Sequence, residues 1–319
     1  MSVRLAIVLA LIVAAVPGIA SARSASVVIS FRTPTGNIGQ QILYGILDSG
    51  EPVRVIARDP ARLSSHIRRH VEVVEGSHGD GKVAERAFEG ADSVFWLVPP
   101  DDKAQSVEEA YVDFTRPACH AIITQGVKRV VIVSALGRGW PKGTGHVSAS
   151  LAMDDLIMAT GVDCRVLTMP SFMDNLQRQV QAIKSQSTFF SPIAGDLKAP
   201  TCAIRDIAST AAKLLVDHSW TGQSSVAVLG PQDLSLNDMA RIISEVLDKP
   251  VRYQQIPFDA FKDRLTGFGM SEPMAQGMVD MMVAKNEGLD STVSRTREST
   301  TPTSFRLWCE ELLKPAILN

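Results

Sequence analysis

Six continuous apolar runs, rich in β-branched residues and separated by helix-like segments, constrain the fold of this chain more than any other feature. The runs cover residues 26–31, 53–57, 71–75, 93–98, 129–134 and 164–169. Because the runs do not alternate between apolar and polar residues, they predict strands that are covered on both faces. Strands that alternate with helices at intervals of roughly 20–35 residues form right-handed βαβ units. The sequence therefore predicts an α/β fold built on a doubly wound parallel sheet.

The alternation of strands and helices loosens after Pro170. We expect a Rossmann-type core over about residues 26–170 and a smaller C-terminal α/β lobe, mostly residues 171–319. A capped helix is predicted to begin near Ser235 or Asn237, followed by a short strand. Further helices are predicted over residues 257–265, 271–288 and the end of the chain. We expect this lobe to pack over the carboxyl edge of the sheet, where open α/β sheets bind ligands.

The first 22 residues resemble a secretory leader. Arg4 precedes twelve apolar residues, and Ala20-Ser21-Ala22 has the small-x-small form of a signal-peptidase site. The apolar run is short for a membrane span, which needs roughly 20 residues. We therefore expect export, for example to the periplasm, and no stable membrane span after the leader is removed. An uncleaved anchor or a misassigned start codon remain alternatives, and the protein would then be cytoplasmic if no anchor holds it.

Charge and cysteine usage exclude several classes of function. The formal net charge is −2, so the electrostatic term that drives nucleic-acid binding is missing, and no nucleic-acid partner is expected. The four cysteines form no C-x-x-C pair and have no zinc-like spacing, and no metal site is predicted. Buried, unpaired thiols are the favoured interpretation, with disulfides or metal ligands as the alternative.

The turn after the first run has the composition of a pyrophosphate-binding loop. A glycine-rich loop of this type places one glycine in the turn, one against the phosphates and one between helix and strand. Gly36 and Gly39 keep the second and third positions, but Thr33 occupies the first and Pro34 restricts it. The free N–H groups of the following helix would face the diphosphate. The predicted contacts are Thr33, Thr35, Gly36, Asn37, Ile38 and Gly39.

Arginines follow the second run, where sites that prefer NAD usually have an acidic residue. Arg58 takes that place and Arg62 comes one helical turn later. A guanidinium binds oxyanions through two parallel hydrogen bonds, which suits the 2′-phosphate of NADP. The sequence therefore favours NADP(H), with NAD(H) as the second possibility. The alternative is a solvated arginine or one paired with Asp59 or another acid.

Other candidate cofactor contacts follow the later runs. Asp80 would accept from the adenine amino group, or else cap the next helix. Leu97, Val98 and Pro99 would line the nicotinamide ribose, or else simply end the fourth strand. Ser134 and Pro170 follow the fifth and sixth runs. Ser134 is interpreted as a carboxamide or ribose contact, or alternatively as a strand cap.

An ordered series of motifs resembles the NmrA-like group of atypical short-chain dehydrogenases/reductases. The likeness runs from about Ser26 to the C-terminal helix, and the motifs are "TPTGNIGQQI", "VRVIARDPARL", "GADSVFWLVPP", "GVKRVVIVSALG", "GVDCRVLTMPSFMDN" and "IRDIASTAAKLLVD". The resemblance implies an NAD(P)-binding Rossmann domain with a small C-terminal lobe. Members include NAD(P)H-dependent quinone and azo-dye reductases, and nucleotide-sensing regulators without demonstrated turnover.

The chain departs from the family pattern at three places. Thr33 replaces a glycine, and Met169 precedes Pro170 where arginine is common. Short-chain dehydrogenases use a serine, a tyrosine and a lysine for catalysis, and the corresponding residues here are Ser134, His146 and Ser150. Imidazole titrates near neutrality, so His146 is the candidate proton donor. The alternative is a histidine placed by chance in a glycine-rich surface loop.

Two hypotheses for function follow. The favoured one is an NAD(P)H-dependent oxidoreductase that transfers hydride to a small, electrophilic, quinone- or azo-like acceptor. Such an acceptor needs less acid assistance than a ketone does. The alternative is a non-catalytic NADP(H)-sensing protein, which would have a protein partner. The methionines between Met270 and Met282 would form either an adaptable wall over the substrate or ordinary core packing.

Overall fold

The central sheet contains seven parallel strands, and six of them coincide with the predicted apolar runs. The computed structural model describes residues 27–30, 37–141 and 143–318. The strand order is β10-β6-β5-β4-β1-β2-β3. The strands are β1 (Val27–Ser30), β2 (Val53–Ala57), β3 (Val71–Glu75), β4 (Ser93–Trp96), β5 (Arg129–Ala135), β6 (Asp163–Met169) and β10 (Gln223–Ala227). The predicted doubly wound α/β architecture is confirmed.

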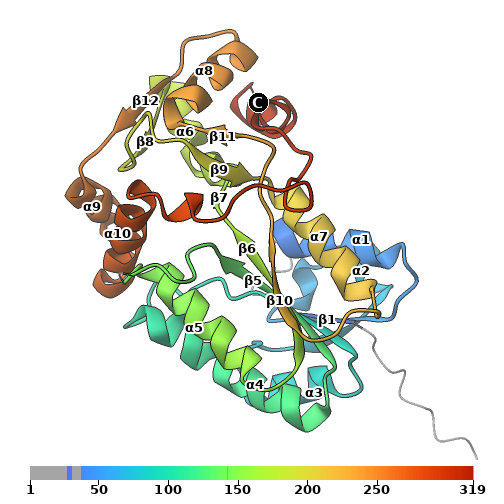
Figure 1. The fold of residues 1–319 in the computed structure, drawn as a ribbon. Coiled ribbons are helices and arrows are strands. Elements are labelled where there is room, and N and C mark those ends of the chain that lie inside the picture. Colours follow the sequence, from blue (N-terminus) through green and yellow to red (C-terminus); the bar gives the residue numbers. More distant parts are fainter. Residues whose placement is uncertain (1–26, 31–36, 142, 319) are drawn as a thin grey trace, which may run out of the picture.

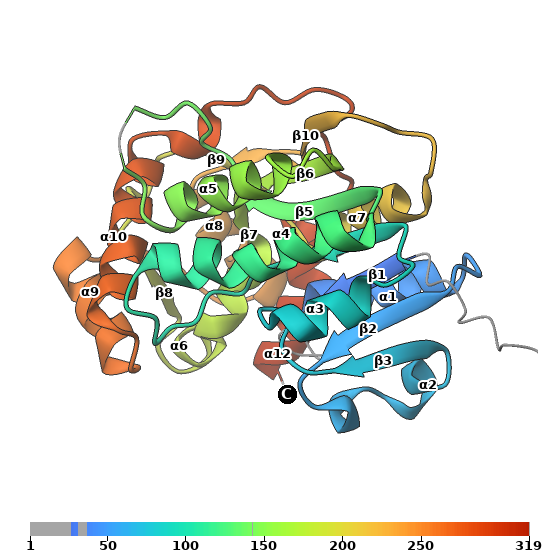
Figure 2. The same cartoon turned by 90° about the horizontal axis from the view of Figure 1, so that it is seen from below.

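Helices cover both faces of this sheet (Figure 2). On one face lie α1 (Asn37–Leu47) and α7 (Ile204–Val216). On the other lie α3 (Gly81–Phe88), α4 (Phe114–Gln125) and α5 (His146–Met158). The short segments η1 (Pro60–Arg62), α2 (Ser65–Arg68) and η2 (Glu109–Asp113) join these layers.

Successive residues of one strand enter two separate cores, which explains why the runs are continuously apolar. In β1, Val27 and Ile29 pack in the cluster formed with α1 and α7. Val28, between them, packs in the cluster formed with α3, α4 and α5. All three side chains are fully buried. A polar residue at any of these positions would place a polar side chain in one of the two apolar cores, which is why strands of parallel sheets are continuously apolar.

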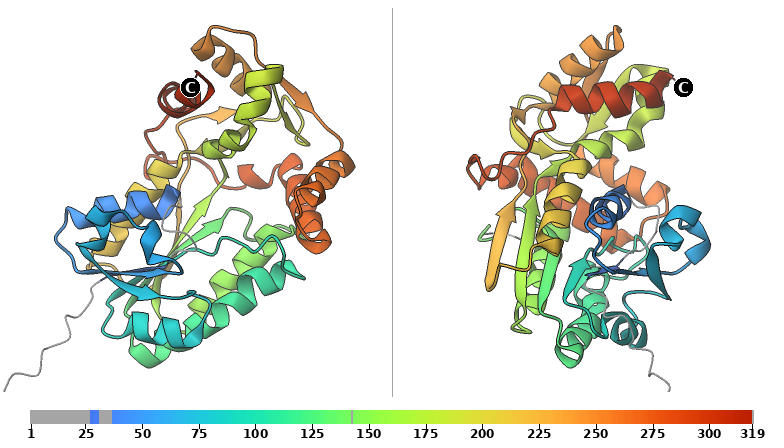
Figure 3. Two further views of the ribbon diagram at one scale, coloured as in Figure 1. Left: turned by 180° about the vertical axis from the view of Figure 1, so that it is seen from behind. Right: turned by 90° about the vertical axis from the view of Figure 1, so that its right-hand side faces the viewer.

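The smaller lobe lies at the carboxyl end of the sheet (Figures 1 and 3). It contains two small sheets, ordered β11-β9-β7 and β12-β8. Its elements are β7 (Ser171–Phe172), η3 (Met173–Gln179), α6 (Val180–Gln186), β8 (Thr188–Ser191), β9 (Ala199–Cys202), β11 (Asp233–Leu234), α8 (Leu236–Leu247), β12 (Arg252–Gln255), α9 (Phe258–Gly267), α10 (Glu272–Asn286), η4 (Leu289–Ser291), α11 (Phe305–Trp308), η5 (Cys309–Leu313) and α12 (Lys314–Leu318).

The predicted helix start near Ser235 is confirmed by its capping contacts. Ser235 Oγ accepts from the Asp238 N–H, and the Asp238 carboxylate accepts from the Ser235 N–H, which forms a capping box. The chain after Pro170 also returns to the core, because α7 and β10 belong to the main layers. No strand was predicted at β10 from the sequence.

The structure also tests the predictions about membrane spans and about the cysteines. Among the helices that the structure describes, none is both long and apolar enough to cross a membrane. All four cysteines are buried and none forms a disulfide, which confirms the favoured interpretation of these residues. The leader predicted at residues 1–22 lies outside the described residues, as do Thr33, Thr35 and Gly36.

Candidate active site

The candidate site lies where the strand order reverses, between the carboxyl ends of β1 and β4. Val27 pairs with Val53 of β2 on one side and with Ser93 of β4 on the other. The chain connections therefore diverge from this point, which is where open α/β sheets bind ligands. The first turn of α1 begins beside it.

The described part of the predicted phosphate loop forms the start of α1. Asn37 begins the helix, and Ile38 and Gly39 are buried in its first turn. Ile38 packs into the core shared with α7, so the helix axis is fixed against the sheet. The first N–H groups of any α-helix lack partners within the helix, so an anion can bind at such a turn. The diphosphate contacts themselves stay predictions.

Two arginines follow β2, at the position where the sequence predicts a contact with the 2′-phosphate of NADP. Arg58 and Arg62 are both exposed, the first directly after β2 and the second at the end of η1. The neighbouring acid has a structural role, because Asp59 Oδ1 accepts from the Ala61 N–H at 3.0 Å and caps η1. The donor set at this edge therefore suits a phosphate better than a ribose hydroxyl.

The remaining cofactor candidates follow β3, β4 and β6 along the chain. Asp80 Oδ1 accepts from the N–H groups of Lys82 (2.9 Å) and Val83 (3.2 Å), which is the capping alternative. An adenine contact by Asp80 stays a prediction. Leu97, Val98 and Pro99 follow β4, with Val98 buried and its neighbours half-buried. Pro170 is buried between β6 and β7. None of these residues lies far from the carboxyl edge of the sheet, where the cofactor is predicted to bind.

Ser134 belongs to a buried polar cluster that the sequence analysis missed. It lies near the end of β5, and its hydroxyl donates to Asp154 Oδ2 at 2.5 Å. The Ser134 and Ser150 hydroxyl oxygens are 3.2 Å apart. Ser150 and Asp154 both come from α5, one helical turn apart, so they share the face turned toward β5. Ser134 and Ser150 stand at positions that correspond to the catalytic serine and lysine of short-chain dehydrogenases. Asp154 adds a carboxyl group to this cluster.

Asp154 is the most buried acid in this region. Its side chain is 0% exposed, and Oδ1 has no hydrogen-bond partner among the described residues. Burial raises the pKa of the Asp154 carboxyl to about 7, against the Ser134 hydrogen bond and the Arg138 charge, which lower that pKa. Arg138 Nη2 lies 3.7 Å from Oδ2. The spacing His146-Ser150-Asp154, four residues each, is the sequence signal that identifies this face.

His146 lies at the first turn of α5 and contacts two other elements. Its Nε2 is 3.0 Å from the Met274 carbonyl oxygen of α10, so Nε2 donates to that carbonyl. Its Nδ1 lies 3.4 Å from the Tyr111 hydroxyl, and the two rings meet edge to face. The side chain is buried, and burial lowers the pKa of the imidazole. A catalytic role for His146 stays a prediction, and its contacts show a link between α5, η2 and α10.

Close backbone packing accompanies this link. Gly145 precedes α5 with φ +54°, and a Cβ on it would lie 2.0 Å from the Gly277 carbonyl oxygen. A Cβ on Gly277 would lie 2.6 Å from the Val107 side chain. Of the predicted methionine wall, Met274 is buried near Ala104 and Ala110, which is core packing. The lobe therefore sits directly against the start of the helix that carries Ser150 and Asp154.

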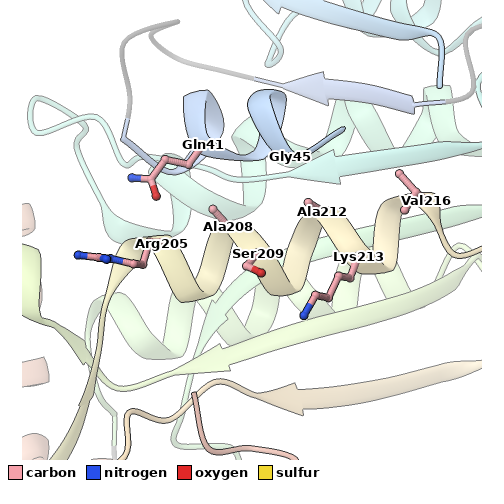
Figure 4. Close-up of a pocket in the computed structure, with 8 residues that line it drawn as sticks. All are labelled: Gln41, Gly45, Arg205, Ala208, Ser209, Ala212, Lys213 and Val216. Carbon is pink, nitrogen blue, oxygen red and sulfur yellow. The ribbon is translucent and has the colours of Figure 1, made fainter. Parts of the chain in front are cut away.

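A surface pocket lies elsewhere, between α1 and α7 (Figure 4). Its lining residues are Gln41, Gly45, Arg205, Ala208, Ser209, Ala212, Lys213 and Val216. None of the predicted site residues lines it. The pocket therefore does not define the candidate active site.

Comparison with known proteins identifies relatives along nearly the whole chain. The NmrA-like family matches residues 26–306. An NAD(P)H azoreductase of Xenophilus azovorans is 28% identical over 250 residues, which are 77% of this chain and 83% of that protein. A (4-alkanoyl-5-oxo-2,5-dihydrofuran-3-yl)methyl phosphate reductase of Streptomyces griseus is 25% identical, covering 87% and 95%.

A solved structure shows that the fold is shared. The NADPH-dependent quinone oxidoreductase of Escherichia coli, complexed with NADPH, superimposes with a TM-score of 0.71 at 18% identity. The match covers 88% of this chain and 97% of that one. Both the Rossmann core and the C-terminal lobe therefore have counterparts in that structure.

Proposed function

The chain belongs to the NmrA-like family, and on that premise we propose that it is an NAD(P)H-dependent oxidoreductase acting on a small electrophilic acceptor. The proposed acceptor is quinone- or azo-like, in keeping with relatives named as azoreductase and quinone oxidoreductase. The observation that carries the proposal is the strand reversal between β1 and β4, with the first turn of α1 beside it and two exposed arginines after β2.

NADP(H) is the proposed cofactor. When bound, it supplies the hydride for reduction of the acceptor. The amides of the turn that contains Gly36 and Gly39 would hold the diphosphate, and Arg58 and Arg62 would hold the 2′-phosphate. Leu97, Val98 and Pro99 would line the nicotinamide ribose, and Ser134 would contact the ribose or the carboxamide.

The absence of the tyrosine and lysine fits an acceptor that is already electrophilic. Here His146 and Ser150 occupy those positions, and both side chains are buried. A ketone needs a strong proton donor as its oxygen gains charge, whereas a quinone or azo group accepts hydride with weaker assistance. The chain's own contribution is therefore positioning and exclusion of water, together with one hydroxyl, that of Ser134.

Cofactor binding tests the site directly. We expect NADPH to bind with saturable enhancement of its fluorescence, and Arg58→Ala to weaken that binding by roughly 10- to 100-fold, because a charge-assisted hydrogen bond is lost. Binding of NADH, which lacks the 2′-phosphate, should change little. Arg68→Ala, at an exposed position on α2, is the matched control. Equal weakening of NADPH and NADH by Arg58→Ala would refute the assignment of the 2′-phosphate.

A sensing function is the second candidate, and one contact favours it. His146 joins α5 to the Met274 carbonyl of the lobe, so a ligand at the sheet edge has a short path to α10. A sensor would bind NADPH and change lobe mobility without turnover. Hydrogen exchange of α10 with and without NADPH distinguishes a sensor from an enzyme when it is read together with acceptor-dependent NADPH consumption.

A further inference from the structure

The Ser134 hydroxyl has a single proton, and its oxygen lies 2.5 Å from Asp154 Oδ2 and 3.2 Å from the Ser150 hydroxyl oxygen. A carboxylate can only accept hydrogen bonds, so an ionised Asp154 takes the Ser134 proton inward and leaves Ser134 only lone pairs for other partners. A protonated Asp154 can instead donate to Ser134, which then can donate its own proton elsewhere.

We propose that Asp154 is a positioning residue whose ionisation state decides whether the Ser134 hydroxyl donates inward, to the carboxylate, or outward, toward the proposed cofactor site. The proposal rests on the proposed function, in which Ser134 contacts the cofactor or the acceptor. Asp154 itself is 0% exposed and acts through Ser134. A neutral Asp154 therefore makes Ser134 a hydrogen-bond donor, which is the state that assists a developing negative charge.

The surroundings of Asp154 allow both ionisation states. The unpartnered Oδ1 gives the carboxylate a desolvation cost that favours the neutral acid. Arg138, in the segment after β5, favours the ionised form from 3.7 Å, but it also donates to Asp155 at 2.8 Å. The Asp155 charge opposes ionisation of Asp154. The Asp154 charge also contributes, after burial, to raising the pKa of the Cys164 thiol of β6.

Among the described residues, the charged groups that shift the Asp154 pKa are Arg138 and Asp155. His146, two turns earlier on α5, binds the Met274 carbonyl of α10 through its Nε2. Burial lowers the pKa of His146, which keeps that imidazole neutral at neutral pH. The ionisation of Asp154 therefore depends on a few neighbouring residues, namely Ser134, Arg138 and Asp155. The effect of substituting one of them on the Asp154 pKa can be measured separately.

Infrared titration of the full chain without cofactor tests the contact. We expect a protonated carboxyl signal that disappears with a midpoint near pH 7 in the wild-type protein and is missing in Asp154→Asn. Ser134→Ala should raise the midpoint by about one to two pH units, because the carboxylate loses its hydrogen bond. Ser148→Ala, the same change on the exposed face of α5, should leave it in place.

A second readout connects the contact to the site. At saturating NADPH, the rate of acceptor reduction should fall as pH rises through the infrared midpoint. Asp154→Asn should remove this inflection. Ser134→Ala should also remove it, although the Asp154 carboxyl of that variant still titrates in the infrared measurement. If no acceptor is reduced, the proposed function fails, and the pH dependence of NADPH affinity replaces the rate as the second readout.

Three results would overturn the proposal. The first is a carboxyl that is ionised from pH 5 to pH 8, the range in which neutral and ionised forms should exchange. The second is an infrared midpoint that does not move in Ser134→Ala. The third is an inflection in rate or affinity that persists in Asp154→Asn or in Ser134→Ala. The infrared outcomes decide the Ser134–Asp154 link whether or not the protein has turnover.

Discussion

Between pH 4 and pH 7 the wild-type protein should lose about 4 kcal/mol of unfolding free energy relative to Asp154→Asn. Burial raises the Asp154 pKa from 3.8 to about 7, so in this window the folded chain holds a proton that the unfolded chain has released. Stability falls with rising pH wherever the folded state binds more protons. About three pH units at ~1.4 kcal/mol each give the expected loss. Below pH 4 both states are protonated, and above pH 7 the loss levels off.

Urea unfolding at several pH values measures this difference. Other titrating groups contribute to both proteins, so the difference between the two curves isolates Asp154. Asp263→Asn, which removes an exposed carboxylate on α9, controls for net charge. Parallel curves for wild type and Asp154→Asn from pH 4 to pH 7 would show that the buried acid is not neutral in the folded protein.

Replacing Gly145 with alanine should destabilise the junction of α5 and α10 by roughly 3 kcal/mol or more. The Gly145 backbone has φ +54° and ψ −118°, a combination that a residue with a Cβ avoids. The new Cβ would also lie 2.0 Å from the Gly277 carbonyl oxygen, which belongs to backbone and cannot rotate away. The helix start or α10 must therefore move, and the contact between His146 and Met274 with it.

Thermal unfolding and NADPH affinity measure this effect together. Gly143→Ala is the matched control, because a Cβ there meets no atom within 4 Å and its φ is ordinary. It should leave both quantities unchanged. If Gly145→Ala had wild-type stability, the close approach of α5 and α10 would not describe the protein in solution.

The core of the fold could be predicted because burial on both faces has a local signature. Val27, Val28 and Ile29 read as one apolar run since adjacent side chains enter different cores. The strand β10 lacks that signature. It pairs only with β6, at the edge of the sheet, and its first three residues are exposed. A polar edge strand far along the sequence has no local feature that separates it from a loop.

The buried polar cluster around Asp154 could not be predicted for a similar reason. Helix starts and strand ends follow from local patterns, which located Gly39, Arg58 and Ser134. The burial of Asp154 depends on how α5 packs against β5, and an aspartate in a helix is exposed more often than not. His146 was identified from family spacing, but its binding to the Met274 carbonyl comes from residues 128 positions apart. Such contacts are tertiary, and sequence periodicity does not contain them.

The most direct test of the account is anaerobic consumption of NADPH by the purified protein with a series of quinones and azo dyes. We expect NADPH to disappear in step with the acceptor, with one hydride transferred for each acceptor reduced by two electrons. The rate should be lower with NADH, and Arg58→Ala should abolish that preference. NADPH that binds but is not consumed with any member of the series would contradict an oxidoreductase.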